Sequence, residues 1–111
     1  MDLLKVKRMK LRQGGRTKLL KQDERYSKKF NEMIANLVEE EGYRYKVCIF
    51  MFGEEPEEPS EKKKNNLLKF AASYYWDEED YEFVSGDCCY SDGEVYAQLI
   101  VRWRPTEDEA I

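Results

Sequence analysis

Histidine is absent from this 111-residue sequence, and cysteine and proline are scarce, with three residues of each. Without histidine, no serine or cysteine nucleophile can have the imidazole base that such catalysis commonly uses. A zinc site would lack its usual ligands, because Cys48, Cys88 and Cys89 are the only thiols. We therefore expect a protein that is not an enzyme, with no metal site and no cofactor.

Long apolar runs are also missing. The longest clean run, residues 47–52, is far shorter than the roughly 20 residues that cross a bilayer. The N-terminus stays charged and has no apolar segment typical of a signal peptide. Two of the three cysteines are sequence neighbours, which favours reduced thiols. These features predict a cytoplasmic protein that does not enter a membrane.

The sequence also lacks the patterns of a phosphate-binding loop and of a calcium-binding loop. Gly14 and Gly15 are not followed by the Gly-Lys-Ser/Thr ending of a phosphate-binding loop. The acidic clusters lack the glycine-centred spacing of a calcium loop, so a solvated surface is the favoured interpretation.

Charge and aromatic residues are plentiful: charged residues make up 38% of the chain and aromatic residues 14%. The charge is uneven, because residues 1–29 hold eleven Lys/Arg against three Asp/Glu, whereas residues 30–111 hold eight against twenty. The basic segment makes nucleic-acid binding an alternative, with seven candidate phosphate contacts. These are Lys5, Lys7, Arg8, Lys10, Arg12, Arg16 and Lys18. The acidic remainder of the chain argues against this alternative.

Two helices are predicted in the N-terminal part. Residues 2–12 hold apolar positions compatible with a helix that stops at Gly14. A second helix begins near Asp23, with Asp23 or Ser27 as its cap, and ends at Gly42. Its apolar face has the spacing of one buried stripe. The stripe consists of Tyr26, Phe30, Met33, Ile34, Leu37 and Val38.

Four strands are predicted after Gly42. Residues 43–52 alternate and are apolar on both faces, which is typical of a central strand. Residues 53–66 read as a long solvated loop, and the further strands span residues 67–76, 81–90 and 94–104. Asp92-Gly93 predicts a two-residue hairpin. Residues 105–111 form an acidic tail. The fold class is α+β, with two N-terminal helices packed on a four-stranded antiparallel sheet.

This order of elements resembles the Tctex-type dynein light chains over about residues 3–104. The matching features are Gly14-Gly15 after a short helix, the strand entry from Tyr45 to Met51, and a small-residue strand ending in Trp76-Asp77. Tyr96 early in the last strand also fits. The long loop at 53–66, the apolar last strand and the acidic tail depart from the family pattern.

The resemblance implies that residues 1–111 form a single Tctex-like dynein light chain domain. It implies a homodimer in which the second strand crosses into the partner's sheet. The function implied is a light-chain subunit or cargo adaptor of a dynein motor, located in the cytoplasm, the cytoskeleton or a cilium or flagellum. Its partners would be extended peptides of the dynein intermediate chain or of cargo. A scaffold outside the motor is the alternative within this class.

The same resemblance places the peptide-binding edge on residues 67–77. An added peptide strand would satisfy the open backbone groups of this edge, as in β-augmentation. Trp76 would be either a partner anchor or a core residue. The candidate site residues are Phe70, Ala71, Ala72, Ser73, Tyr74, Tyr75, Trp76 and Asp77.

Overall fold

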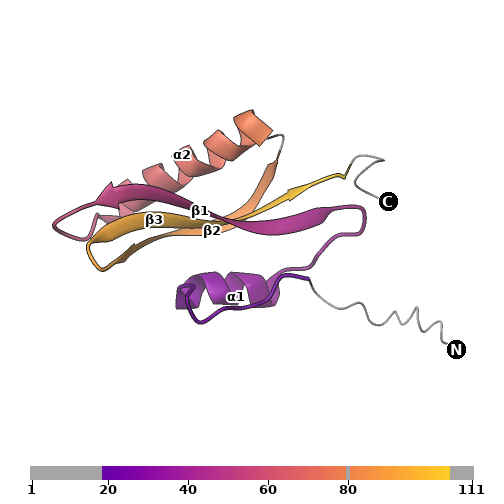
Figure 1. Ribbon diagram of the computed structural model, residues 1–111, viewed down its shortest axis with the longest axis horizontal. Coiled ribbons are helices and arrows are strands. Elements are labelled where there is room, and N and C mark those ends of the chain that lie inside the picture. The colour runs from indigo at the N-terminus through magenta and orange to yellow at the C-terminus, as the bar shows by residue number, and fades with distance from the viewer. Residues whose placement is uncertain (1–18, 80, 106–111) are drawn as a thin grey trace, which may run out of the picture.

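The computed structural model describes residues 19–79 and 81–105, with residues 75–79 described for their backbone alone. The chain forms a small α+β domain in which a three-stranded sheet lies between two helices (Figure 1). The elements are α1 (Lys28–Asn36), β1 (Arg44–Glu54), α2 (Glu61–Glu79), β2 (Glu82–Ser91) and β3 (Glu94–Trp103). The predicted first helix at residues 2–12 and the tail at 106–111 lie outside the described residues.

The sheet is antiparallel with the order β1-β3-β2. Because β3 pairs antiparallel with both neighbours, β1 and β2 run parallel to each other, and α2 connects them across one face. The last strand of the chain is therefore the central one. Its burial fits this place, since Val95, Ala97 and Leu99 are all buried.

The alternating side chains of β3 supply the core on both faces of the sheet. Towards α2, they pack with Cys48 of β1 and with Ala71 of the helix. Towards α1, Ile100 packs with Tyr45, Phe30 and Ile34. The β3 residues on the α2 side are Ala97, Leu99 and Val101.

Helix α1 begins at Ser27, one of the two predicted caps, and the other, Asp23, lies before the helix. The Ser27 Oγ accepts a hydrogen bond from the Phe30 N–H at 3.0 Å, which satisfies one of the unpaired amides of the first turn. The helix ends at Asn36, where Leu37 turns to extended backbone, so the predicted end at Gly42 is wrong. The apolar stripe is confirmed through Phe30 and Ile34, but its last member, Val38, is 85% exposed.

The closing hairpin is confirmed. Asp92 and Gly93 have φ values of 54° and 78°, the positive values that a type I′ turn needs at both centres. Strands β2 and β3 match the predicted ranges to within about one residue at each end.

The predicted strand at residues 67–76 is wrong, because α2 occupies this segment. The helix starts earlier, within the predicted loop: Ser60 Oγ accepts from the Lys63 N–H at 3.2 Å and caps it. Helical spacing then brings Leu68 and Ala71 onto the sheet together. The solvated loop shrinks to residues 55–60, the described residues hold three strands instead of four, and residues 67–76 cannot be a swapped strand.

The prediction that residues 43–52 form a central strand is also wrong. Strand β1 lies at an edge of the sheet, and Ile49 and Met51 are 44% and 54% exposed. Strand β1 is apolar on both faces, as an interior strand is, yet among the described strands it pairs with β3 alone.

We predict that Gly86→Ala destabilises the fold. A Cβ at Gly86 would lie 2.7 Å from the backbone oxygen of Gln98, and backbone cannot move aside as a side-chain end can. Overpacking of this kind costs about 1–3 kcal/mol in the free energy of unfolding, which urea titration measures. The exposed control Ser73→Ala should change it by less than about 0.5 kcal/mol. Equal unfolding midpoints for Gly86→Ala and wild type would contradict the close approach.

Candidate functional site at the outer edge of β1

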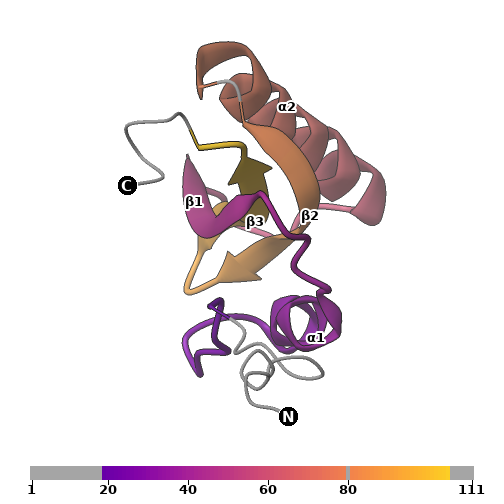
Figure 2. The same cartoon turned by 90° about the vertical axis from the view of Figure 1, so that its right-hand side faces the viewer.

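The outer side of β1 is one of the two edges of the sheet, and the outer side of β2 is the other. Helix α2 lies mainly over β2 and β3, and α1 lies mainly over β2, so the helices reach β1 through side chains such as Phe70 and Phe30 while its outer side stays beyond them. Figure 2 shows this arrangement, with β1 on the side of the sheet away from the two helices.

The hairpin determines which backbone groups of β3 face β1. In a two-residue hairpin the flanking residues, here Ser91 and Glu94, form a hydrogen-bonded pair. Successive strand residues direct their backbone groups to alternate edges, so the even-numbered residues of β3 bond to β2 and the odd-numbered ones bond to β1. The hydrogen bond from the Glu55 N–H to the Gly93 oxygen, at 2.9 Å, fits this parity.

The register then determines which groups of β1 point outwards. Lys46, Cys48 and Phe50 lie opposite odd-numbered residues of β3 and bond to them. The intervening residues direct their N–H and C=O groups away from the sheet. No backbone bond from another described segment reaches these groups. The outward-facing residues are Tyr45, Val47, Ile49 and Met51.

The outward-facing residues carry their side chains on the α1 face. Tyr45 and Val47 pack into the core at one end, while Ile49 and Met51 remain exposed at the other. Ile49 and Met51 line a groove of about 470 Å³ together with Tyr26 and Tyr96. An added strand at this edge would therefore meet open backbone groups and the exposed apolar side chains of Ile49 and Met51.

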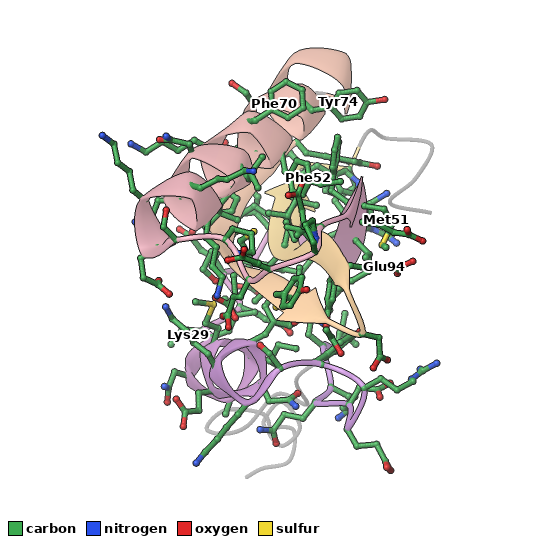
Figure 3. All side chains as sticks on the ribbon, turned by 90° about the vertical axis from the view of Figure 1, so that its left-hand side faces the viewer. Lys29, Met51, Phe52, Phe70, Tyr74 and Glu94 are labelled. Carbon is green, nitrogen blue, oxygen red and sulfur yellow. The ribbon has the colours of Figure 1, made fainter. Side chains whose placement is uncertain are left out.

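Aromatic side chains cover the opposite face of the same edge. The Phe50 ring makes edge-to-face contacts with Phe70 and Tyr74 of α2, with centroids 5.9 and 5.4 Å apart. Phe52 stacks beside Phe50 at 5.0 Å. Figure 3 shows Phe70 and Tyr74 projecting from α2 above Phe52. Phe70 and Tyr74 are 58% and 47% exposed. We call Phe50, Phe52, Phe70 and Tyr74 the aromatic cluster.

Charge changes sign along β1. Arg44 at its start and Arg104 beside it, which lies over the Tyr43 ring, make the first end basic. Glu54 at its end and Glu94 at the start of β3, its register partner, make the second end acidic. Between these ends, the side chains of the outward-facing residues carry no charge.

The predicted site residues all lie on α2 and not on a strand edge. Ala71 is buried against the sheet, whereas Ala72 and Ser73 line a groove of about 530 Å³ beside Phe83. Phe70 and Tyr74 belong to the aromatic cluster. The side chains of the other three predicted residues lie outside the described part; these are Tyr75, Trp76 and Asp77.

Sequence reasoning missed Ile49, Met51, Phe50 and Phe52 as site residues. Their signal was present, because the run around residues 45–52 alternates and is apolar on both faces. We interpreted that signal as burial, since nothing local tells an interior strand from an apolar edge strand.

A polar pocket of about 330 Å³ lies near β2, lined by Ser27, Asp87 and Cys89 among others. Asp87 Oδ2 accepts from Ser27 Oγ at 3.0 Å, and the same Ser27 Oγ caps α1. Gln98 Oε1, although buried, accepts from the Ser27 N–H at 3.1 Å. Burial raises the pKa of the Cys89 thiol to about 11, so it stays protonated near neutral pH. The polar groups of this network anchor α1 to the sheet.

No protein-family model, curated protein or solved structure matches this chain. Among the described residues, no group of three His, Cys, Asp or Glu side chains is placed to hold a metal ion. The helices within the described ranges are too short or too polar to cross a membrane.

We predict that the Cys89 thiol is slow to react in the folded protein. Its raised pKa lowers the thiolate fraction at pH 8 by at least about tenfold relative to an ordinary cysteine. Reaction of the Cys48→Ala, Cys88→Ala variant with a disulfide reagent, followed by absorbance, should speed up at least that much in urea. A cysteine introduced by Ser73→Cys, which is exposed, should react at the ordinary rate without urea. Equal rates for Cys89 in folded and unfolded protein would contradict its burial.

The Cys89 thiol also makes the free energy of unfolding depend on pH in the alkaline range. The pKa of Cys89 is raised in the folded protein. The contribution of this thiol to the free energy of unfolding is therefore fully present below the ordinary pKa of 9.0 and is lost as pH rises towards about 11. Urea titrations across this window should show wild type losing more unfolding free energy than Cys89→Ala. Parallel curves for the two proteins would contradict the raised pKa.

Proposed function

We propose that this protein is a non-catalytic protein-binding module that receives an extended segment of another polypeptide at the outer edge of β1. The supporting observation is that the backbone groups of Tyr45, Val47, Ile49 and Met51 point away from the sheet. An added strand would pair with these groups, so that main-chain bonds give affinity and the flanking side chains give selectivity.

The composition of the edge supports this function. Natural proteins commonly protect edge strands with charged residues, proline or bulges, because open edges pair with other chains. In β1 the bulge lies only near its end, between Met51 and Gly53. The outward-facing residues include neither a charge nor a proline. An unprotected apolar edge of this kind is expected where a partner covers it.

The aromatic cluster supplies a second element of the proposed site. Phe70 and Tyr74 are more exposed than ordinary core aromatics, and they border β1 on the face opposite Ile49. Aromatic side chains contribute large contact areas at interfaces with little loss of side-chain entropy. A bound strand would thus be bordered by apolar side chains on both faces of the sheet.

This proposal keeps the binding mechanism implied by the Tctex resemblance and moves it from residues 67–77 to β1. The dynein light-chain or cargo-adaptor role, with its intermediate-chain or cargo partner and its cytoskeletal location, remains a prediction that rests on the resemblance alone. A non-motor scaffold is equally compatible with the β1 edge. Nucleic-acid binding also remains a prediction, because residues 5–18 lie outside the described part.

We predict that Ile49→Pro weakens peptide binding without unfolding the protein. Proline removes an N–H that points outwards, so the internal ladder is kept while an added strand loses a donor and meets the ring. Peptides are first selected from a random library on dilute immobilised wild-type protein. Their affinity for Ile49→Pro, measured by fluorescence anisotropy, should be at least about tenfold weaker than their affinity for wild type.

The matched control is Ile49→Thr, which keeps both the β-branched shape and the N–H. Its affinity for the selected peptides should lie within about threefold of the wild-type affinity, because the backbone hydrogen bonds to the added strand contribute most of the affinity. A library that yields no binder, or binders that Ile49→Pro holds as tightly as wild type, would contradict the proposed site. Circular dichroism checks that each variant is folded.

A further inference from the structure

The charge pattern of β1 suits one occupant in particular. The basic end, with Arg44 and Arg104, and the acidic end, with Glu54 and Glu94, lie at opposite ends of the same open edge. Arg102, also near the basic end, has its Nη1 and Nε 2.7 Å from the Glu40 and Glu82 carboxylates. An antiparallel strand with the same pattern would place each basic end opposite an acidic one.

Strand β1 of a second copy has this pattern by definition. A two-fold axis makes an interface in which the same surface appears on both subunits, so a strand can pair with itself only in antiparallel orientation across that axis. Charge complementarity would then act twice, once at each end of the paired strands. A parallel arrangement of the two copies would bring like charges together instead.

The backbone parity of β1 also permits self-pairing. An axis at Ile49 places Ile49 opposite its own counterpart and Val47 opposite Met51 of the other copy. All of these residues direct their backbone groups outwards, so every pair can exchange hydrogen bonds. The bulge between Met51 and Gly53 limits this ladder to the apolar middle of the strand.

Side chains on both faces fit the same arrangement. Ile49 and Met51, exposed in one copy, would pack against Ile49 and Val47 of the other on the α1 face. On the opposite face, this register places Phe50 opposite Cys48 of the other copy and diagonal to its Phe50, with the exposed Phe70 beside each Phe50, while Phe52 lies towards Lys46 of the other copy. The apolar surface exposed on both faces of β1 would be covered by one partner.

We infer that the occupant of the β1 edge is β1 of a second copy, giving a two-fold dimer with a continuous six-stranded antiparallel sheet. This inference rests on the proposed function, because it names the partner of the same edge. It differs from the strand swap that the family resemblance implies, since no element leaves its own subunit.

The test is the mass of the protein in solution, measured by sedimentation equilibrium from low micromolar to near-millimolar concentration. Wild type should reach twice the 13.3 kDa of one chain. Ile49→Pro should weaken association at least about tenfold, because the two-fold axis removes two donors at once. A second variant, Ile49→Lys with Met51→Lys, keeps the N–H groups and should also give a monomer. The exposed control Val38→Lys should leave the dimer unchanged.

Charge reversal tests the orientation. Arg44→Glu and Glu54→Arg should each weaken the dimer by up to about tenfold, since each change places like charges together at both ends. Combining the two should restore association in one protein, and added salt should reduce all of these differences. If the combined variant associates no more tightly than the single variants, the antiparallel arrangement is overturned.

The outcomes separate this inference from the proposed function. Wild type that stays monomeric at every concentration, yet binds selected peptides more tightly than Ile49→Pro does, overturns the self-pairing and leaves the strand-binding edge standing. A dimer that both β1 variants leave intact overturns the inference, because its interface lies elsewhere. A monomer that also binds no peptide overturns both.

Discussion

The pairing of β3 with a neighbour on each of its edges is the constraint on which the rest of the structure depends. It makes the last strand the centre of the sheet and buries its side chains against both helices. The hairpin at Asp92 and Gly93 sets the parity of this strand, so that alternate residues bond to β2 and to β1. Through the register, the same parity turns half of the backbone groups of β1 outwards.

The placement of the helices gives that outward edge its functional meaning. Because α2 connects β1 to β2 and packs over β2 and β3, and α1 also packs on β2, neither helix covers the far side of β1. The edge thus combines open backbone groups with Ile49 and Met51 on one face and the aromatic cluster on the other. Under the proposed function, such a surface would receive an added strand. In that proposal, the change of charge sign along β1 would set the orientation of the bound strand.

The sequence predicts the parts of this fold that local chemistry determines. The Ser27 cap, the Asp92-Gly93 turn and the alternation of β3 follow from short-range rules and are present. The segment from Leu67 onwards was misassigned because Phe70, Tyr74 and Tyr75 favour strands by propensity. Packing of Leu68 and Ala71 on the sheet outweighs that preference. This one error hides the crossover, and with it the edge position of β1 and the site.

Amide hydrogen exchange of β1 in the dilute protein, resolved by NMR, tests the central claim most directly. The account predicts an alternation along the strand: the amides of Lys46, Cys48 and Phe50 exchange slowly, because they bond to β3, and those of Val47, Ile49 and Met51 exchange much faster. Raising the protein concentration should slow the fast set alone. Uniform slow exchange along β1 at every dilution would contradict the account, because it would mean that the strand has a partner on both sides within one chain.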